Sequence, residues 1–345
     1  MASAFRHEHH VGLFADRTRL RVLRSRLGKD AAPRVSHEAV TAQKAKIITR
    51  MPADPGSPRA VLSRDTDRAA ERLQVALWRR MAAGAKLTTA GAASTATLRL
   101  SLAGIRIRAP HADENAHHLT LARIRLGAEL VRQAYSASDP RNMEPMTIMD
   151  PVDVALTVAA ALDRCGVRYV VGGSLASSVS GEPRSTVDVD VMVDIAESTI
   201  ACVIEALGPG FYADPDAFAR AVRLRSSVNV IHLPTATKVD LFVMGATPIE
   251  PEQMDRRMKV QVSDRAGAEL YVYTAEDILL QKLRWYRLGN EASDRQWRDI
   301  LGIIAVQADA LDLAYLRGAA ARIDVPDLLS RALADAGPPP QSESL

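Results

Sequence analysis

Short apolar runs alternate with amphipathic stretches through the second half of the chain. The apolar runs have the length and β-branched composition of strands and cover Arg168–Val171, Val187–Val193, Ser227–His232, Lys238–Val243 and Glu269–Tyr273. Apolar positions at helical spacing surround them, over Pro151–Cys165, from about Ser174, over Glu197–Leu207 and Pro215–Arg225, and from Thr274 to about Ala334. This alternation predicts an α/β (α+β) domain over residues 150–335, in which C-terminal helices pack beside a small mixed sheet.

Residues 58–137 show helical patterns alone. An N-cap at Asp65–Asp67 starts the first helix, and further helices are expected over Ala93–Arg106 and Asn115–Ala134. The piece Gly104–His111 is expected to be a positively charged loop. The segment therefore predicts a small all-α module.

The remaining segments lack sustained periodicity. Residues 1–57 are basic, end in a stretch rich in Pro and Gly, and are expected to form a disordered arm. Such an arm could contact nucleic-acid phosphates, or it could be an extension without a role of its own. Residues 138–149 read as a linker, and residues 336–345 as a disordered tail.

Composition excludes several classes of protein. Two cysteines, Cys165 and Cys202, are too few for a disulfide scaffold or a cysteine-based zinc site, and they suit a reducing cytoplasm. No run approaches the ~20 apolar residues that cross a bilayer, and the first residues lack the apolar segment of a secretory signal. We therefore expect a cytoplasmic protein with no membrane partner, and its composition is typical of bacteria. The net charge of +3 is too small to indicate nucleic-acid binding by itself.

Two aspartates alternate with valines in the run Val187–Val193. Because side chains alternate across a strand, Asp188 and Asp190 share one face, about 7 Å apart along the backbone. Two carboxylates in this position repel each other unless cations neutralise them, and hard oxygen donors suit Mg²⁺. Taken alone, the pattern fits equally well a half-exposed strand with a polar outer face.

A glycine turn precedes these aspartates. Gly172, Gly173 and Ser174 follow a buried run and open a helix. Glycines let backbone amides approach an anion, and a helix N-terminus adds positive potential. Such a turn can hold the β- and γ-phosphates of a nucleotide. One helix and one loop separate it from Asp188, so both can meet at the same edge of the sheet.

Together these motifs resemble the nucleotidyltransferase superfamily that includes the β-type DNA polymerases. The shared signature is Gly172-Gly173-Ser174, thirteen intervening residues, and then Asp188-Val-Asp190. The family also carries a third carboxylate on a later strand, which Asp240 matches. The resemblance spans most of residues 165–300 and implies a fold like that of DNA polymerase β.

A closer likeness is to the bacterial AbiEii-type toxin nucleotidyltransferases. That branch carries an Arg before the aspartates, matched by Arg184, and a helix with a Lys, matched by Lys282. Lys282 would contact the triphosphate or lie on a solvated face, and Arg184 would contact phosphate or pair with an aspartate. Asp277 and Asp299 also match, but a helix cap or a salt bridge explains them equally well. The all-α module resembles an uncharacterised helical module of bacterial nucleotidyltransferase loci.

The resemblance implies a two-metal enzyme that transfers NMP from an NTP to a hydroxyl acceptor and releases pyrophosphate. Three aspartates would hold Mg²⁺ or Mn²⁺: Asp188, Asp190 and Asp240. The last of these would also receive the proton of the acceptor hydroxyl. The NTP would be bound by Gly172, Gly173, Ser174, Arg184 and Lys282.

The acceptor stays open at this stage. The leading reading is a toxin-like enzyme that acts on RNA or tRNA and is controlled by a cognate antitoxin or regulatory protein, and Arg106, Arg108 and the basic arm favour it. An alternative is a small-molecule or protein nucleotidyltransferase that modifies an antibiotic or adenylylates its target. Another alternative is a non-catalytic binding or toxin–antitoxin partner module, which the intact glycine turn and three aspartates disfavour.

Overall fold

The computed structural model describes residues 62, 66–135, 148–262 and 267–336. The predicted basic arm, nearly all of the predicted tail and most of the predicted linker lie outside these residues. Residues 58–345 form one compact unit, so the all-α module and the α/β part are described together.

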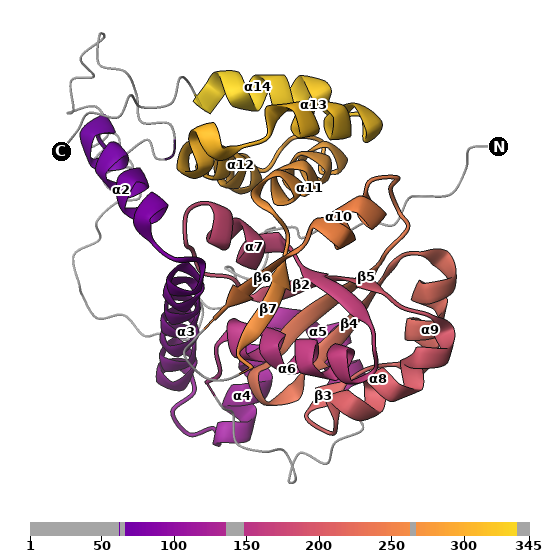
Figure 1. Ribbon diagram of the computed structural model, residues 1–345. Helices are drawn as coiled ribbons and strands as arrows, with labels where there is room; N and C mark the ends of the chain where they lie inside the picture. The colour runs from indigo at the N-terminus through magenta and orange to yellow at the C-terminus, as the bar shows by residue number, and fades with distance from the viewer. Residues whose placement is uncertain (1–61, 63–65, 136–147, 263–266, 337–345) are drawn as a thin grey trace, which may run out of the picture. The chain divides into compact units, whose positions relative to one another are not determined.

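A seven-stranded mixed sheet organises the unit, in the order β3-β4-β5-β2-β1-β7-β6 (Figure 1). Its strands are β1 Arg168–Val171, β2 Asp188–Asp194, β3 Phe211–Tyr212, β4 Ser227–His232, β5 Thr237–Val243, β6 Met258–Gln261 and β7 Glu269–Val272. β2 is parallel to β5 and antiparallel to β1, while β1 is parallel to β7. The predicted α/β fold with a mixed sheet is confirmed, although the short edge strands β3 and β6 were not predicted.

Helices cover both faces of the sheet. One core lies beneath α6 Pro151–Arg164, α8 Ile200–Leu207 and α9 Pro215–Leu224. The opposite core contains residues of α7 Gly173–Ser180, α10 Glu250–Arg256, α11 Ala275–Leu288, α12 Asp294–Gln307, α13 Leu313–Arg322 and α14 Pro326–Ala336. The last four helices lie together on one side of the sheet, as predicted for the C-terminal part (Figure 1). The unpredicted α10 belongs to this second core as well.

Strand periodicity decides which side of the sheet each β2 side chain faces. Val189, Val191 and Val193 are buried in the core beneath α6, whereas Met192 belongs to the opposite core. Asp188 and Asp190 therefore face the side of the C-terminal helices. Val187, unlike the three valines of β2, does not lie in the core. This residue precedes β2, is 47% exposed, and its carbonyl accepts a hydrogen bond from an arginine described below.

Four helices precede the sheet: α2 Arg68–Arg80, α3 Ala83–Arg108, α4 Glu114–Leu126 and α5 Ala128–Tyr135. The Asp67 carboxylate caps α2, as predicted. The predicted loop Gly104–His111 was wrong, because α3 continues to Arg108 and Pro110 follows it. The predicted third helix is divided at Gly127, whose φ of +81° ends α4.

The all-α segment is tied to the sheet through a buried hydrogen bond. The amide of Thr186 donates to Ser94 Oγ on α3 (2.9 Å). Thr186 lies two residues before Asp188, so α3 fixes the approach to β2. Gly91 lets the same helix approach the start of α6, because a Cβ there would lie 1.6 Å from the Asp150 carboxylate that caps α6.

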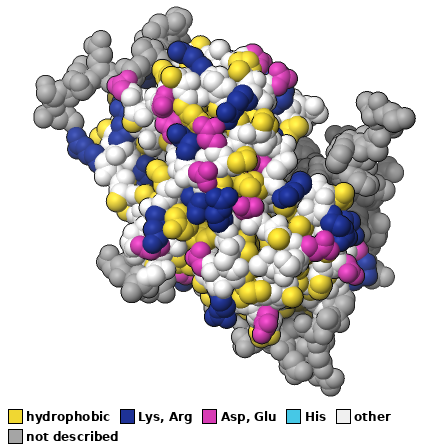
Figure 2. Space-filling view, turned by 45° about the vertical axis from the view of Figure 1, so that its right-hand side comes forward, with side chains coloured by type: hydrophobic (Ala, Val, Ile, Leu, Met, Phe, Trp, Pro, Cys, Tyr) yellow, Lys and Arg dark blue, Asp and Glu magenta, His cyan; other side chains and the backbone are white. Residues whose placement is uncertain are grey.

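Within the part of the chain that the structure describes, no helix is both long and apolar enough to cross a bilayer. Basic and acidic side chains are interspersed over the face shown in Figure 2.

A disulfide joins Cys165, at the end of α6, to Cys202 on α8. The sequence analysis interpreted the two cysteines as typical of a reducing compartment, and it did not predict that they form a disulfide. The two residues are 37 positions apart, and the adjacent packing of α6 and α8 brings them together.

The disulfide should contribute to stability. Replacing both cysteines by serine is expected to lower the free energy of unfolding by about 2–4 kcal/mol, because the open chain regains loop entropy. Urea denaturation of the oxidised protein would measure this difference. In the presence of a thiol reductant, the native and variant curves should coincide. Native curves that are unchanged by the reductant would contradict a stabilising disulfide.

Candidate active site

The parallel pairing of β2 with β5 places acidic residues next to each other. Asp190 is the register partner of Asp240, and Asp188 is the register partner of Lys238. Register partners on neighbouring strands point to the same face, so all three aspartates lie on the side of the C-terminal helices. Each is half-buried. The structure therefore brings the three predicted aspartates to one place on the sheet.

Burial and like charges oppose ionisation of Asp188 and Asp190. Burial, followed by the charges of Asp240 and Asp188, raises the pKa of Asp190 to about 6, against the opposing effect of Lys282. The pKa of Asp188 is also raised, first by burial, although Lys238 acts in the opposite direction. The site thus holds negative charge that favours any cation able to enter.

Lys238 supplies part of the missing positive charge. Its Nζ lies 2.5 Å from Asp240 Oδ2. Among the described residues, no three His, Cys, Asp or Glu side chains converge as they would around a metal ion. The donor set nevertheless suits Mg²⁺, because it consists of carboxylate oxygens. A metal at Asp240 would have to displace the Lys238 ammonium.

The predicted glycine turn lies directly against these carboxylates. The amide of Gly172 donates to the carbonyl of Asp190 (2.8 Å), which joins the end of β1 to β2. Gly173 has a φ of +52° and begins α7. A Cβ at Gly173 would lie 1.7 Å from Asp190 Oδ2, so this position excludes any side chain. A helix N-terminus and an acidic carboxylate therefore touch.

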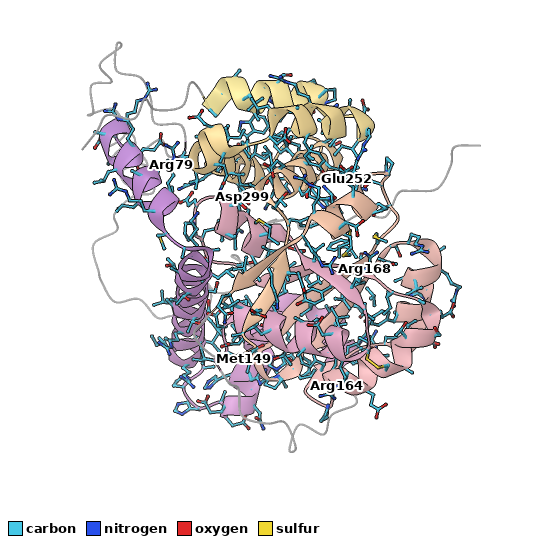
Figure 3. The ribbon with its side chains drawn as sticks, in the orientation of Figure 1. Arg79, Met149, Arg164, Arg168, Glu252 and Asp299 are labelled. Atoms are coloured by element: carbon cyan, nitrogen blue, oxygen red, sulfur yellow. A yellow bond between two sulfur atoms is a disulfide. The ribbon has the colours of Figure 1, made fainter. Side chains whose placement is uncertain are left out.

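An ion-paired network links the other predicted residues. Arg184 donates to both carboxylate oxygens of Asp299 (2.6 Å each), and Lys282 Nζ lies 2.6 Å from Asp299 Oδ2. Arg184 also donates to Ser174 Oγ (2.9 Å). Burial opposes the ionised form of Asp299, but the hydrogen bond from Arg184 and the charge of Lys282 outweigh it and lower the pKa. Asp299 lies on α12, which packs against α7 (Figure 3).

This network changes the roles expected of two cations. Arg184 and Lys282 are already paired with Asp299, so they position the turn and raise the local positive potential. Lys282 also acts electrostatically on Asp190, where it opposes the rise in pKa. Of the alternatives open for Asp299, the structure shows the salt bridge.

Asp277 lies in a different network. It is fully buried, its amide donates to Thr274 Oγ1 (3.2 Å), and its carboxylate accepts hydrogen bonds from Thr274 Oγ1 (2.9 Å) and Tyr315 OH (2.6 Å). Arg256 is its ionic partner (3.3 Å). Asp277 therefore stabilises the start of α11 and its contact with α13.

Two arginines near Asp188 were not predicted. Arg125, on α4, donates to the carbonyl of Val187 (2.8 Å) and contacts Thr237 Oγ1 (3.4 Å). Arg295, on α12, donates to the carbonyl of Ser185 (3.2 Å). The charges of both arginines partly offset the rise that burial causes in the pKa of Asp188. Arg125 lies 62 residues from its partner, and no sequence motif marks it.

Neither a protein-family model nor a curated protein matches the sequence. Three solved structures are similar in part. A nucleotidyltransferase-like antigen of Paracoccidioides brasiliensis has 19% identity and a TM-score of 0.31 over 52% of this chain and 91% of its own. The antibiotic-resistance factor ANT(2'')-Ia has 15% identity and a TM-score of 0.34 over 54% and 100%. JHP933 from Helicobacter pylori has 16% identity and a TM-score of 0.29 over 53% and 80%. At TM-scores this low, the likenesses establish no function for this chain.

Asp299 should be essential for stability. Asp299→Asn leaves the Arg184 and Lys282 cations without their counter-charge, and it is expected to reduce the free energy of unfolding by about 3–5 kcal/mol. The exposed Asp294, at the start of the same helix, provides a control: Asp294→Asn should change it by no more than about 0.5 kcal/mol. Equal urea midpoints for the two variants would show that the buried network is not stabilising.

Asp190 should make stability depend on pH when no metal is present. Its pKa of about 6 exceeds the unfolded value of 3.8, so the folded state binds the proton more tightly. The contribution of Asp190 to the free energy of unfolding is therefore fully present below pH 4, and it is lost as the pH rises through about 6. In EDTA, Asp190→Asn should become more stable than the native protein by about 2–3 kcal/mol at pH 7.5.

The control for this measurement is Asp194→Asn, at the other end of the same strand. It should retain the native pH dependence. If the free energy of unfolding of the native protein had the same pH dependence as that of Asp190→Asn, the raised pKa of Asp190 would be contradicted.

Proposed function

We propose that this protein is a divalent-metal-dependent nucleotidyltransferase that moves NMP from an NTP to a hydroxyl acceptor. The contact between the Asp190 carboxylate and Gly173 at the start of α7 carries this proposal. A helix N-terminus attracts phosphate, whereas an aspartate cluster repels it. Both can serve one ligand when a divalent cation lies between the carboxylates and the phosphates, as in an NTP–Mg²⁺ complex.

The metal ligands in this proposal are Asp188, Asp190 and Asp240. Bound there, Mg²⁺ or Mn²⁺ would neutralise phosphate charge and make the acceptor hydroxyl more acidic. The raised pKa values of Asp188 and Asp190 support this assignment, because burial and neighbouring carboxylates disfavour their ionised forms and a bound cation would stabilise them.

The remaining residues position the substrate. The amides of Gly172 and Gly173 and the Ser174 hydroxyl line the start of α7, where the terminal phosphates would bind. Arg184 and Lys282 lie behind this turn, held by Asp299, and contribute positive potential. Asp240 is placed to receive the proton of the acceptor hydroxyl. Catalysis of this kind depends on positioning and electrostatics.

Cations around Asp188 favour an acceptor that carries phosphate. Arg125, Arg295 and Lys238 each act electrostatically on Asp188. Once a divalent metal neutralises the three aspartates, these cations would favour a phosphate-bearing acceptor such as an RNA end over a polycationic small molecule. We therefore retain the toxin-like, RNA-modifying interpretation, with control by a partner protein as part of the same proposal.

Label transfer would test the reaction. The protein is incubated with Mg²⁺, each labelled NTP in turn, total RNA and cell lysate. Transfer to one fraction is expected from the native protein. Asp190→Asn and Asp240→Asn should each reduce the rate at least about 100-fold, because both remove metal-bound oxygens.

Asp194→Asn is the matched control, since Asp194 lies on the same face of β2 but pairs with Arg168 at the far end. This variant should transfer label at the native rate. A second readout needs no turnover: Mg²⁺ should raise the melting temperature of the native protein but not that of Asp190→Asn. Absence of transfer from every NTP to every fraction would exclude the proposed reaction.

A further inference from the structure

The order of the strands separates the two sides of the proposed reaction. The glycine turn follows β1, and the sheet then continues through β2 and β5 to β4. Asp240 on β5 is therefore one strand further from the phosphate-binding turn than Asp190 on β2. If the terminal phosphates bind at the turn, the acceptor reaches Asp240 from the side of β4 and β5. This step rests on the proposed function.

Two polar side chains extend the site in that direction. Asn229 on β4 is the register partner of Asp240, and Ser227 is the register partner of Phe242. These pairs share the face that carries Asp240. Asn229 and Ser227 are exposed, so a ligand beside Asp240 can reach them.

An aromatic pair lies next to these residues. Phe242, two positions after Asp240 on the same face, has its ring 5.7 Å from the ring of Trp285 on α11. Trp285 is 43% exposed although it is large and apolar. The guanidinium of Arg284 lies 5.7 Å from the Trp285 ring. An exposed aromatic side chain with a neighbouring arginine is the combination on which single-stranded nucleic acids stack.

We infer that Asn229, Phe242 and Trp285 form the acceptor subsite and that the acceptor is a nucleoside. Its base stacks on Trp285, its ribose hydroxyl lies beside Asp240, and the Asn229 amide offers a donor and an acceptor to its polar groups. Arg284 and Lys238 border the subsite with positive charge, which suits the phosphate of a nucleotide and disfavours a polyamino sugar.

Variants of Trp285 test the subsite. Trp285→Ala should raise KM for the acceptor roughly tenfold and leave KM for the NTP unchanged, because one base–aromatic stack is lost. Trp285→Phe should retain most of the affinity. Leu288→Ala is the matched control, since Leu288 lies on the same helix and is 59% exposed, and it should behave as the native protein does.

Three acceptors distinguish the source of the nucleoside: free nucleoside monophosphates, short RNA oligonucleotides that differ in their 3′ base, and kanamycin as a polyamino sugar. Transfer to the monophosphates or to the oligonucleotides supports the subsite and tells the two sources apart. Transfer to kanamycin alone would overturn the inference. A raised KM for the NTP with an unchanged acceptor KM would also overturn it and would assign Trp285 to the base of the NTP.

A binding measurement separates this inference from the proposed function. Titration with an RNA oligonucleotide should quench tryptophan fluorescence of the native protein but not that of Trp285→Phe. Quenching without any label transfer would keep the subsite and reject the reaction. Transfer to RNA with equal quenching in both proteins would keep the reaction and reject the subsite.

Discussion

The repulsion among three carboxylates on one face of the sheet is the constraint on which the rest of the site depends. The parallel register of β2 and β5 fixes Asp190 beside Asp240, and no rotamer can separate them widely. Cations from four different elements partly offset this repulsion: Arg125 on α4, Lys238 on β5, Lys282 on α11 and Arg295 on α12. They do not cancel the effects of burial and of the neighbouring carboxylates, which together raise the pKa of Asp190 to about 6. In the proposed function, this unfavourable charge is what a bound metal would neutralise.

Local patterns were sufficient to predict the aspartates and the glycine turn of the candidate site, and insufficient to predict the residues around them. Alternation in β2 and the glycines before α7 are visible in adjacent residues, so Asp188, Asp190 and the turn could be predicted together with the class of fold. The pairing of Asp299 with Arg184 depends on how α12 packs against α7, which no spacing along the chain encodes. The same holds for Arg125 and Trp285, which reach the sheet from helices far away in the sequence. The end of α3 was mispredicted because Arg106 and Arg108 were read as a loop, although Pro110 is the first residue able to stop the helix.

The cysteines show a similar limit. The presence of only two cysteines was interpreted as typical of a reducing compartment. Their pairing, however, follows from the packing of α6 against α8 beneath the sheet. Counting residues gives the supply of thiols and not their separation in space. The disulfide lies on the core side away from the aspartates, so it supports the scaffold and leaves the chemistry to the other face.

The hydrogen bonds that join Ser94 and Arg125 to the residues just before β2 have a consequence for how the molecule opens. Composition suggests a boundary near residue 149, but the residues that lead into β2, beyond that boundary, are held by residues that precede it. Amide exchange in β2 should therefore follow the opening of α3 and α4, and local fluctuations of the helical segment would reach the aspartates as changes in their spacing. The two segments that the sequence suggests are therefore expected to open together and not as independent units.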